Sequence, residues 1–223
     1  MKKRIACLHA HYSNIEYIER SLSEYDVDIM HFVDPALMHR VTHDKTFTIS
    51  EAKQRVKEQI VWMSKCQVDA ILITCTNYIA ILADEELPLS IPILKIDEPY
   101  FEYLCKVDQP QMILFTNPAT VQGTMDRLYD YANRQGKTLA PEVVIINDTF
   151  ELMMEGKTKE YNQAVMDYLL KAIENEDKTI SVAQLSMVDA AEQVENVSTK
   201  TIINPLQTLI SSLVQELTLK KHG

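Results

Sequence analysis

Cys75 is the residue of this sequence best suited to nucleophilic or proton-transfer chemistry. It follows the buried-strand pattern of Ala70–Thr74 and precedes Thr76-Asn77 and a helical pattern. A thiol at a helix N-terminus has a lowered pKa, and the thiolate is the reactive form. The pattern predicts that Cys75 is a catalytic thiolate; the alternative is a small buried core cysteine.

The other cysteines and a pair of histidines give no comparable signal. Cys7 falls inside a strand pattern, Cys66 at a helix end and Cys105 in a helical stretch, and no C-x-x-C spacing occurs. His39 and His43 have the i, i+4 spacing that places two imidazoles on one helix face, but no matching third ligand is evident. We therefore expect reduced thiols, no disulfide framework and no metal site.

Further polar residues gather where the strand patterns end. Ligands of open parallel sheets bind beyond the carboxyl ends of the strands. We therefore expect the substrate-binding residues at these positions. They are His9, His11, Ser13, Asn14, Thr76, Asn77, Thr116, Asn117, Thr120, Gln184 and Ser186.

Two groups among these residues have a second interpretation. Thr76-Asn77 and Thr116-Asn117 offer hydroxyl, amide and backbone N–H donors that suit a carboxylate, yet Thr and Asn also cap helices routinely. His9 or His11 could serve as an acid or base, or could be a structural histidine held by hydrogen bonds. The sequence leaves both alternatives open.

Short apolar runs alternate with helical patterns along the chain, and several runs are rich in Ile and Val, as in strands buried on both faces. The runs are Arg4–His9, Asp28–Val33, Ala70–Thr74, Ile93–Ile96, Met112–Phe115, Val143–Ile146, Thr179–Ala183 and Thr201–Ile203. The helical patterns are Ile15–Leu22, a helix capped by Thr48 that ends near Cys66, Thr120–Arg134, Lys159–Ile173 and Pro205–Leu219. Strands separated by helices pair in parallel, so the predicted fold class is α/β.

The expected strands suggest two halves of four. Arg4–His9 corresponds to Met112–Phe115, and Ala70–Cys75 corresponds to Thr179–Gln184 at a nearly equal separation. We therefore expect two pseudo-symmetric, Rossmann-like lobes with open parallel sheets and a crevice between them. The first lobe comprises residues 1–98 and 205–223 and carries Cys75; the second comprises 99–204 and carries Gln184.

Composition excludes several classes of function. The formal net charge is -10 and the sequence pI is about 5.1, so no nucleic-acid partner is expected. The four glycines form neither a G-x-G-x-x-G motif nor a phosphate loop, which excludes dinucleotide and P-loop chemistry by these motifs. No apolar stretch is long enough for an export signal or a membrane span, so we expect a cytoplasmic protein without membrane contact.

An ordered set of short motifs resembles the aspartate/glutamate/hydantoin racemase superfamily, and most of all a branch with T-C-S, I-D-E-P-M and A-Q-A-S-M segments. The set spans essentially the whole chain. The motifs are Thr74-Cys75-Thr76-Asn77, Lys95-Ile96-Asp97-Glu98-Pro99, Ala183-Gln184-Leu185-Ser186-Met187, Ile203-Asn204-Pro205 and His31-Phe32-Val33-Asp34-Pro35-Ala36-Leu37.

The resemblance implies two α/β lobes and a cofactor-independent active site between them. Characterised members use two cysteines, one per lobe, on opposite faces of a small carboxylate substrate. One thiolate removes the α-proton and the other thiol returns a proton from the far side. Cys75 matches the first cysteine, and Gln184 stands in the place of the second. At the level of the superfamily, a homodimer is a further expectation.

Gln184 changes the chemistry that the resemblance implies. An amide neither accepts nor supplies a proton near neutral pH, so two-base racemisation is not expected unless His9, His11 or a water substitutes. The leading interpretation is a cofactor-independent isomerase- or lyase-type enzyme that acts on a small carboxylic acid through Cys75. The alternatives are a non-catalytic carboxylate-binding protein and an aspartate or glutamate racemase with a substitute acid.

Overall fold

The chain forms two compact units. The computed structural model describes residues 2–83, 85, 87–175 and 177–222. Unit 1 comprises Met1–Glu98 and Leu209–Gly223, and unit 2 comprises Pro99–Thr208. Each unit has its own parallel sheet.

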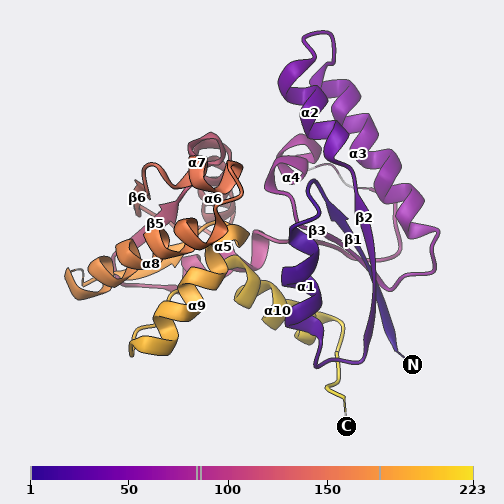
Figure 1. The fold of residues 1–223 in the computed structure, drawn as a ribbon. Helices are drawn as coiled ribbons and strands as arrows, with labels where there is room; N and C mark the ends of the chain where they lie inside the picture. The colour runs from indigo at the N-terminus through magenta and orange to yellow at the C-terminus, as the bar shows by residue number, and fades with distance from the viewer. Residues whose placement is uncertain (1, 84, 86, 176, 223) are drawn as a thin grey trace. The chain divides into compact units, whose positions relative to one another are not determined.

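Unit 1 contains a four-stranded parallel sheet in the order β2-β1-β3-β4 (Figure 1). Its strands are β1 (Lys3–His9), β2 (Val27–Val33), β3 (Ala70–Ile73) and β4 (Ile93–Lys95). Its helices include α1 (Asn14–Leu22), α2 (Pro35–His43), α3 (Ile49–Ser64) and α4 (Thr76–Leu82). Every residue of β3 is buried, because helices cover both faces of the sheet around this central strand.

The two faces of the unit 1 sheet carry different side chains. Successive side chains of a strand point to opposite faces. His9 bonds to a group shared with Asn14 of α1, so Cys7 and His9 point toward α1. Leu8, between them, lines a cavity together with Met63 of α3. Cys7 and His9 of β1 therefore lie on the face of the sheet that α1 covers, which is called the α1 face below.

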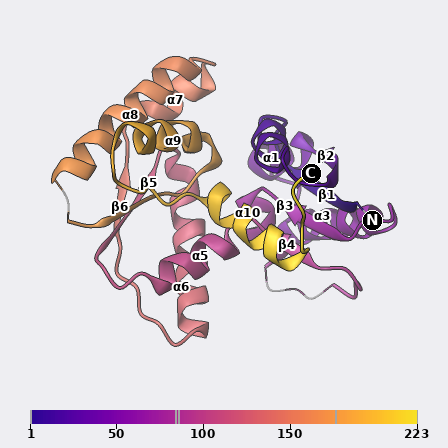
Figure 2. The ribbon, with the colours of Figure 1, turned by 90° about the horizontal axis from the view of Figure 1, so that it is seen from below.

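Unit 2 contains a three-stranded parallel sheet in the order β6-β5-β7 (Figure 2). Its strands are β5 (Gln111–Phe115), β6 (Glu142–Ile145) and β7 (Thr179–Val182). Its helices are α5 (Glu98–Lys106, of which Glu98 belongs to unit 1), α6 (Val121–Arg134), α7 (Thr149–Met154), α8 (Thr158–Asn175) and α9 (Val188–Val197). The short 3₁₀ turns Pro118–Thr120 and Leu185–Met187 follow β5 and β7, and α10 (Pro205–Glu216) contains residues of both units.

The core of unit 2 follows the period of two along β5. Met112 and Leu114 pack into a cluster with residues of α8 and α9. Ile113 and Phe115 pack into a second cluster with residues of α5 and α6. Both faces of the sheet are covered, as expected for a continuous apolar strand.

The two sheets share one strand order, and the predicted α/β fold with two parallel-sheet lobes is confirmed. β1 and β5 are the corresponding strands, flanked by β2 and β6 on one side and by β3 and β7 on the other. The prediction of a strand at Thr201–Ile203 is wrong, because Ile203 makes one isolated parallel bridge with Ser181. The pairing stops there since α10 begins two residues later.

Two helix predictions also need correction. The last helix ends at Glu216 rather than at Leu219. Val188–Val197 forms α9, which was not among the predicted helices. Its small residues Ala190 and Ala191 are fully buried against the sheet, so tertiary packing rather than a clear apolar stripe stabilises it.

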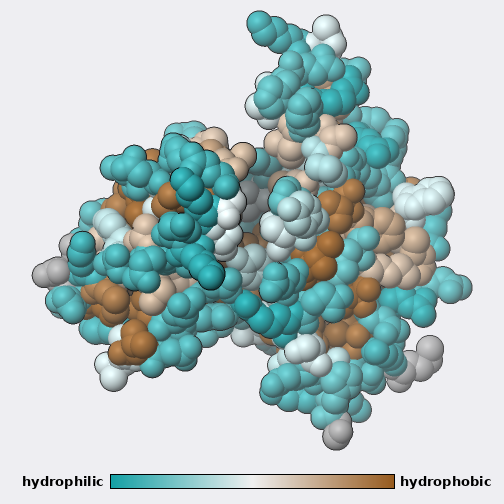
Figure 3. Space-filling view, viewed as in Figure 1, coloured by the Kyte–Doolittle hydropathy of each residue, from teal (hydrophilic) through white to brown (hydrophobic). Residues whose placement is uncertain are grey.

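The visible surface is mainly hydrophilic, with hydrophobic residues in small patches (Figure 3). This agrees with the formal net charge of -10. Among the helices that the structure describes, none combines the length and the apolar character required to cross a bilayer.

The capping hydrogen bonds at the N-terminus of α3 allow a measurement of how much this local sequence motif contributes to stability. The Thr48 hydroxyl accepts a hydrogen bond from the Glu51 backbone N–H (3.2 Å), and the Glu51 carboxylate accepts one from the Thr48 N–H (2.7 Å). Replacing Thr48 by Ala leaves one orphan amide and is expected to lower the free energy of unfolding by about 1 kcal/mol. Urea unfolding measures the loss, and Ser50→Ala on the same turn is the control, expected to change little. Equal effects of the two substitutions would contradict the capping role.

Candidate functional site

Cys75 stands at the point where β3 becomes α4. It is the N-cap residue of α4, with an extended backbone (φ -104°, ψ 114°). The residue is partly exposed, although β3 before it and Tyr78-Ile79 after it are fully buried. Thr76 and Asn77, both predicted to bind substrate, form the first turn of α4, and Asn77 is exposed. The sulfur is therefore held on a buried scaffold at the rim of unit 1.

The prediction of a net lowered pKa for Cys75 is wrong. Burial raises the pKa of this thiol, and the carboxylate of Asp97 adds to the increase. The backbone N–H groups of Tyr78 and Asn77 favour the thiolate and lower the pKa, but they do not outweigh burial. Cys75 is consequently a neutral thiol near pH 7, and a larger thiolate fraction would require a change in the groups around the sulfur.

His9 lies at the carboxyl end of β1 in a buried hydrogen-bond network. Its Nδ1 is 2.8 Å from the Thr74 hydroxyl, to which Asn14 Nδ2 also donates (3.2 Å). Its Nε2 is 2.8 Å from Nδ1 of His31. Burial and then the charge of His31 lower the pKa of His9 to about 4, so the ring is neutral near pH 7. The structure thus brings together two predicted residues, His9 and Asn14, through Thr74, the neighbour of Cys75.

His11 and Ser13 form a separate pair at the surface. The two residues are exposed, and His11 Nδ1 is 2.8 Å from the Ser13 hydroxyl and accepts the Ser13 backbone N–H at 3.2 Å. These bonds close the turn that leads into α1. Their geometry accounts for the two residues as a local turn motif.

The predicted residues of unit 2 form one hydrogen-bonded cluster around Gln184. The Gln184 Oε1 accepts the Thr116 backbone N–H (2.7 Å), the Thr116 hydroxyl (2.9 Å) and the Asn117 backbone N–H (3.0 Å). Its Nε2 donates to the Thr120 hydroxyl at 3.3 Å. All polar atoms of the Gln184 side chain therefore have partners within unit 2.

Ser186 joins the same cluster through Tyr161 of α8. The Tyr161 hydroxyl is 2.8 Å from the Ser186 hydroxyl and 3.0 Å from the Thr116 hydroxyl. Since Thr116 donates its proton to Gln184, it must accept from Tyr161, and Tyr161 must accept from Ser186. Burial raises the pKa of Tyr161, which keeps the phenol protonated and this direction intact.

This arrangement differs from the predicted use of Thr116 and Asn117. Their N–H and hydroxyl donors were expected to hold a carboxylate of the substrate. In the structure, the amide oxygen of Gln184 already occupies the point where these donors converge. A carboxylate would have to displace Gln184 to use them.

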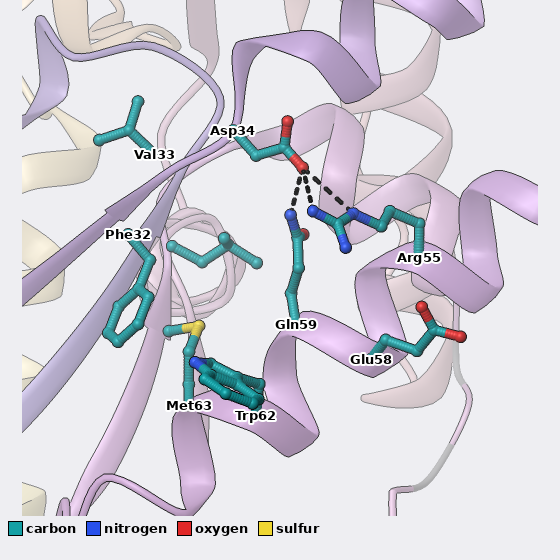
Figure 4. A pocket seen from close by; sticks show the side chains of 9 residues that line it. Phe32, Val33, Asp34, Arg55, Glu58, Gln59, Trp62 and Met63 are labelled. Carbon is teal, nitrogen blue, oxygen red and sulfur yellow. Dashed lines mark hydrogen bonds and ion pairs between the residues drawn. The ribbon is translucent and has the colours of Figure 1, made fainter.

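A cavity of about 600 Å³ lies on the other face of the unit 1 sheet (Figure 4). The Asp34 carboxylate beside it accepts from Arg55 (3.2 Å) and from Gln59, and it also caps α2. Asp34 and Arg55 of this cavity therefore bind each other. None of the predicted site residues lines it.

The chain resembles solved racemase structures over almost its whole length. An aspartate racemase from Picrophilus torridus has a TM-score of 0.71 at 14% identity, covering 99% of this chain and 96% of its own. An allantoin racemase from Klebsiella pneumoniae has a TM-score of 0.66 at 18% identity, covering 99% and 90%. A glutamate racemase from Bacillus anthracis has a TM-score of 0.66 at 17% identity, covering 98% and 83%. Neither a family model nor a curated protein matches the sequence. The shared fold confirms the architecture that the motif resemblance implied.

Sequence reasoning missed three residues that shape these networks. Asp97 was interpreted as a cap or hinge, but its charge acts on Cys75. His31 and Tyr161 were not singled out, because their partners depend on strand register and helix packing. The sequence signals for His31 were its place in a strand pattern next to that of His9 and its place at the start of the motif His31-Phe32-Val33-Asp34-Pro35-Ala36-Leu37.

The cluster around Gln184 predicts a specific pattern of stability. Gln184→Ala leaves three donors without their acceptor and should lower the free energy of unfolding by about 3 kcal/mol. Gln184→Glu retains an oxygen at that point and should cost less. Urea unfolding gives the energies, and hydrogen exchange at Thr116 and Asn117 locates the change. Gln122→Ala, on exposed α6, is the control; a loss as small as that of the control would show that the cluster adds no stability.

The charge of Asp97 predicts the reactivity of Cys75. Asp97→Asn removes a negative charge that opposes ionisation, so the thiolate fraction rises. Because nucleophilicity falls as the pKa falls, each unit of decrease should accelerate alkylation by only about threefold. Peptide mass spectrometry measures the rate at Cys75, with Cys66 as the internal reference. Glu98→Gln is the matched control, since this carboxylate pairs with Lys95 (2.9 Å); an unchanged rate in Asp97→Asn would refute the effect.

Proposed function

We propose that this protein is a racemase-type isomerase or lyase-type enzyme of the aspartate/glutamate/hydantoin racemase superfamily. It acts on a small carboxylic acid through Cys75 and without a cofactor. The observation that carries the proposal is a cysteine that is partly exposed as a residue and caps the helix after β3 of unit 1, in a fold shared with aspartate, glutamate and allantoin racemases.

The surroundings of Cys75 support proton transfer by its sulfur. Its thiol is neutral at rest and becomes a base when it loses its proton, aided by the N–H groups of Tyr78 and Asn77. The thiolate then takes the α-proton, so an S–H bond forms, the C–H bond breaks and its electron pair passes into the adjacent carboxyl group. The reverse transfer restores the thiolate and the C–H bond.

Gln184 sets the stereochemical outcome of this reaction. A glutamine cannot deliver a proton near neutral pH, and its polar atoms are already hydrogen-bonded. His9 is neutral near pH 7 and does not supply a proton as an imidazolium. A single thiol returns the proton to the face from which it came, so the α-proton exchange that accompanies the proposed isomerase- or lyase-type reaction keeps the configuration.

The test is hydrogen exchange in deuterated water with a panel of amino acids, hydroxy acids and dicarboxylic acids. One substrate should gain deuterium at the α-carbon and keep its configuration, as measured by mass spectrometry and chiral chromatography. Cys75→Ala should reduce the exchange at least about 100-fold, because it removes the base. Cys66→Ser is the control and should retain the rate. Exchange that survives Cys75→Ala would refute the proposal.

The alternatives give different results in the same experiment. A racemase with a substitute acid would convert one enantiomer into the other, with deuterium in the product. A carboxylate-binding protein would show binding by calorimetry and no exchange, in both the parent protein and Cys75→Ala.

The raised pKa of Cys75 predicts the pH dependence of the exchange. Only the thiolate is active, and its fraction increases as the pH rises toward the pKa. The value of kcat/KM for the exchange should therefore increase from pH 7 to pH 8 and from pH 8 to pH 9. A rate that is flat from pH 6 upward would indicate a thiol with a low pKa and would contradict the neutral resting state.

A further inference from the structure

Three ligand-bearing side chains converge within unit 1, on the α1 face of the sheet. Cys7 and His9 are two residues apart on β1, and His31 is the register partner of Cys7 on β2. One sulfur or ring-nitrogen atom from each residue lies within 4.8 Å of the other two. Cys7 and His9 are fully buried, and the His31 side chain is 14% exposed.

The outer ring nitrogen of each histidine is held by an oxygen. His9 Nδ1 is 2.8 Å from the Thr74 hydroxyl, and His31 Nε2 is 2.9 Å from a carboxylate oxygen of Glu19. The inner nitrogens, His9 Nε2 and His31 Nδ1, are 2.8 Å apart. Histidines that ligate metals are held by this pattern, with the outer N–H bonded to an oxygen and the inner nitrogen aimed at the ion.

The hydrogen bonds of Thr74 indicate that His9 carries its proton on Nδ1 and a lone pair on Nε2. The Thr74 hydroxyl donates to the backbone oxygen of Leu8 (3.2 Å) and accepts from Asn14. Its remaining lone pair must accept the N–H of His9 Nδ1. Neutral His9 then presents a lone pair at Nε2.

The Glu19 carboxylate has the same effect on His31. A carboxylate only accepts, so His31 carries a proton on Nε2 and, when neutral, presents a lone pair at Nδ1. Two lone pairs facing each other at 2.8 Å repel unless a cation, either a second proton on His31 or a metal ion, lies between them. The neutral alternative requires Thr74 to give up its bond to Leu8 and donate to His9 instead, which makes a hydrogen-bond chain ending at Glu19.

We propose that Cys7, His9 and His31 form a zinc-binding site, with Thr74 and Glu19 as the positioning residues of the two imidazoles. Thiolate sulfur and imidazole nitrogen are the ligands that Zn²⁺ prefers. A tetrahedral zinc ion places two ring nitrogens roughly 3.3 Å apart, so the rings move apart by about half an ångström on binding. A solvent molecule completes the coordination.

Charge balance supports a divalent ion at this position. Burial and then the charge of Glu19 raise the pKa of Cys7, so its thiol does not ionise alone. Zinc binding displaces that proton, and the Cys7 thiolate and the Glu19 carboxylate then offset the two positive charges. The lowered pKa of His9 keeps its ring neutral and able to ligate near pH 7.

This proposal departs from the sequence expectation of no metal site. The histidine pair considered there, His39 and His43, is exposed, with its rings stacked at 4.5 Å. The Cys7-x-His9 spacing places two ligands on one strand face, but the third becomes visible only once the register of β2 is known. The site lies beyond the proposed thiol chemistry, which does not require it.

The experiment measures metal binding directly, on full-length protein purified without a histidine tag and stripped by a chelator. Zinc titration followed by gel filtration and elemental analysis should give one retained ion per chain. Cobalt should give an absorption band of thiolate-to-metal charge transfer. His39→Gln/His43→Gln removes the exposed pair and should retain both signals.

Variants of the ligands and of Glu19 decide the outcome. Cys7→Ser should abolish the charge-transfer band, while Cys105→Ser, at another buried cysteine, should retain it. His31→Gln should abolish retained zinc. Glu19→Gln, whose side chain is 55% exposed and tolerates substitution, should weaken zinc affinity by about 10- to 100-fold.

The readouts are independent of catalysis. Zinc binding that is absent, or that disappears in His39→Gln/His43→Gln and survives His31→Gln, would overturn the proposal and leave the neutral hydrogen-bond chain. Either result leaves the deuterium-exchange test of Cys75 unaffected. Circular dichroism of each variant confirms that a lost signal does not arise from unfolding.

Discussion

The parallel register of β1 and β3 is the constraint on which both parts of unit 1 chemistry depend. Leu8 pairs with Ile73, and the Thr74 N–H donates to the Leu8 oxygen at 3.1 Å. This register sets the Thr74 hydroxyl against His9 and leaves Cys75 two residues beyond the end of β3. A slip of one residue would turn Thr74 to the opposite face, because side chains alternate along a strand. The Thr74 hydroxyl would then no longer face His9 and Asn14.

The two units share one strand order but carry different functional groups at the ends of their strands. The strand end of unit 1 leaves a partly exposed thiol beside backbone N–H groups. The corresponding end of unit 2 carries Gln184, whose amide oxygen satisfies donors of Thr116 and Asn117. Ser186 and Tyr161 extend that network into the core. In the proposed reaction, proton transfer therefore belongs to unit 1, because the polar atoms of Gln184 in unit 2 are hydrogen-bonded within that unit.

The sequence predicted the positions of the strands and helices better than it predicted the pKa of Cys75. Apolar runs located the strands of both sheets, since buried parallel strands need continuous apolar residues. It failed at Thr201–Ile203, where an apolar run is stopped by the next helix after one bridge. It also placed Cys75 at a helix N-terminus but gave the wrong direction for its pKa, because desolvation depends on tertiary packing. The position of His31 beside His9 follows from the register of β1 and β2, which no sequence motif specifies.

Ionisation of Cys7 and of Cys75 is opposed by the same two effects, and the two thiols differ in the groups that can compensate a thiolate charge. Burial raises the pKa of Cys7 and of Cys75 alike, and a nearby carboxylate, Glu19 or Asp97, adds to each increase. Cys7 has two imidazoles within reach, so a divalent ion can compensate its thiolate permanently. Cys75 has the N–H groups at the start of α4, which carry only partial charge. A thiol compensated so weakly stays protonated at rest, and it ionises only in the fraction of molecules that its pKa and the ambient pH allow. That property suits reversible proton transfer, in which the sulfur must release a proton as readily as it takes one.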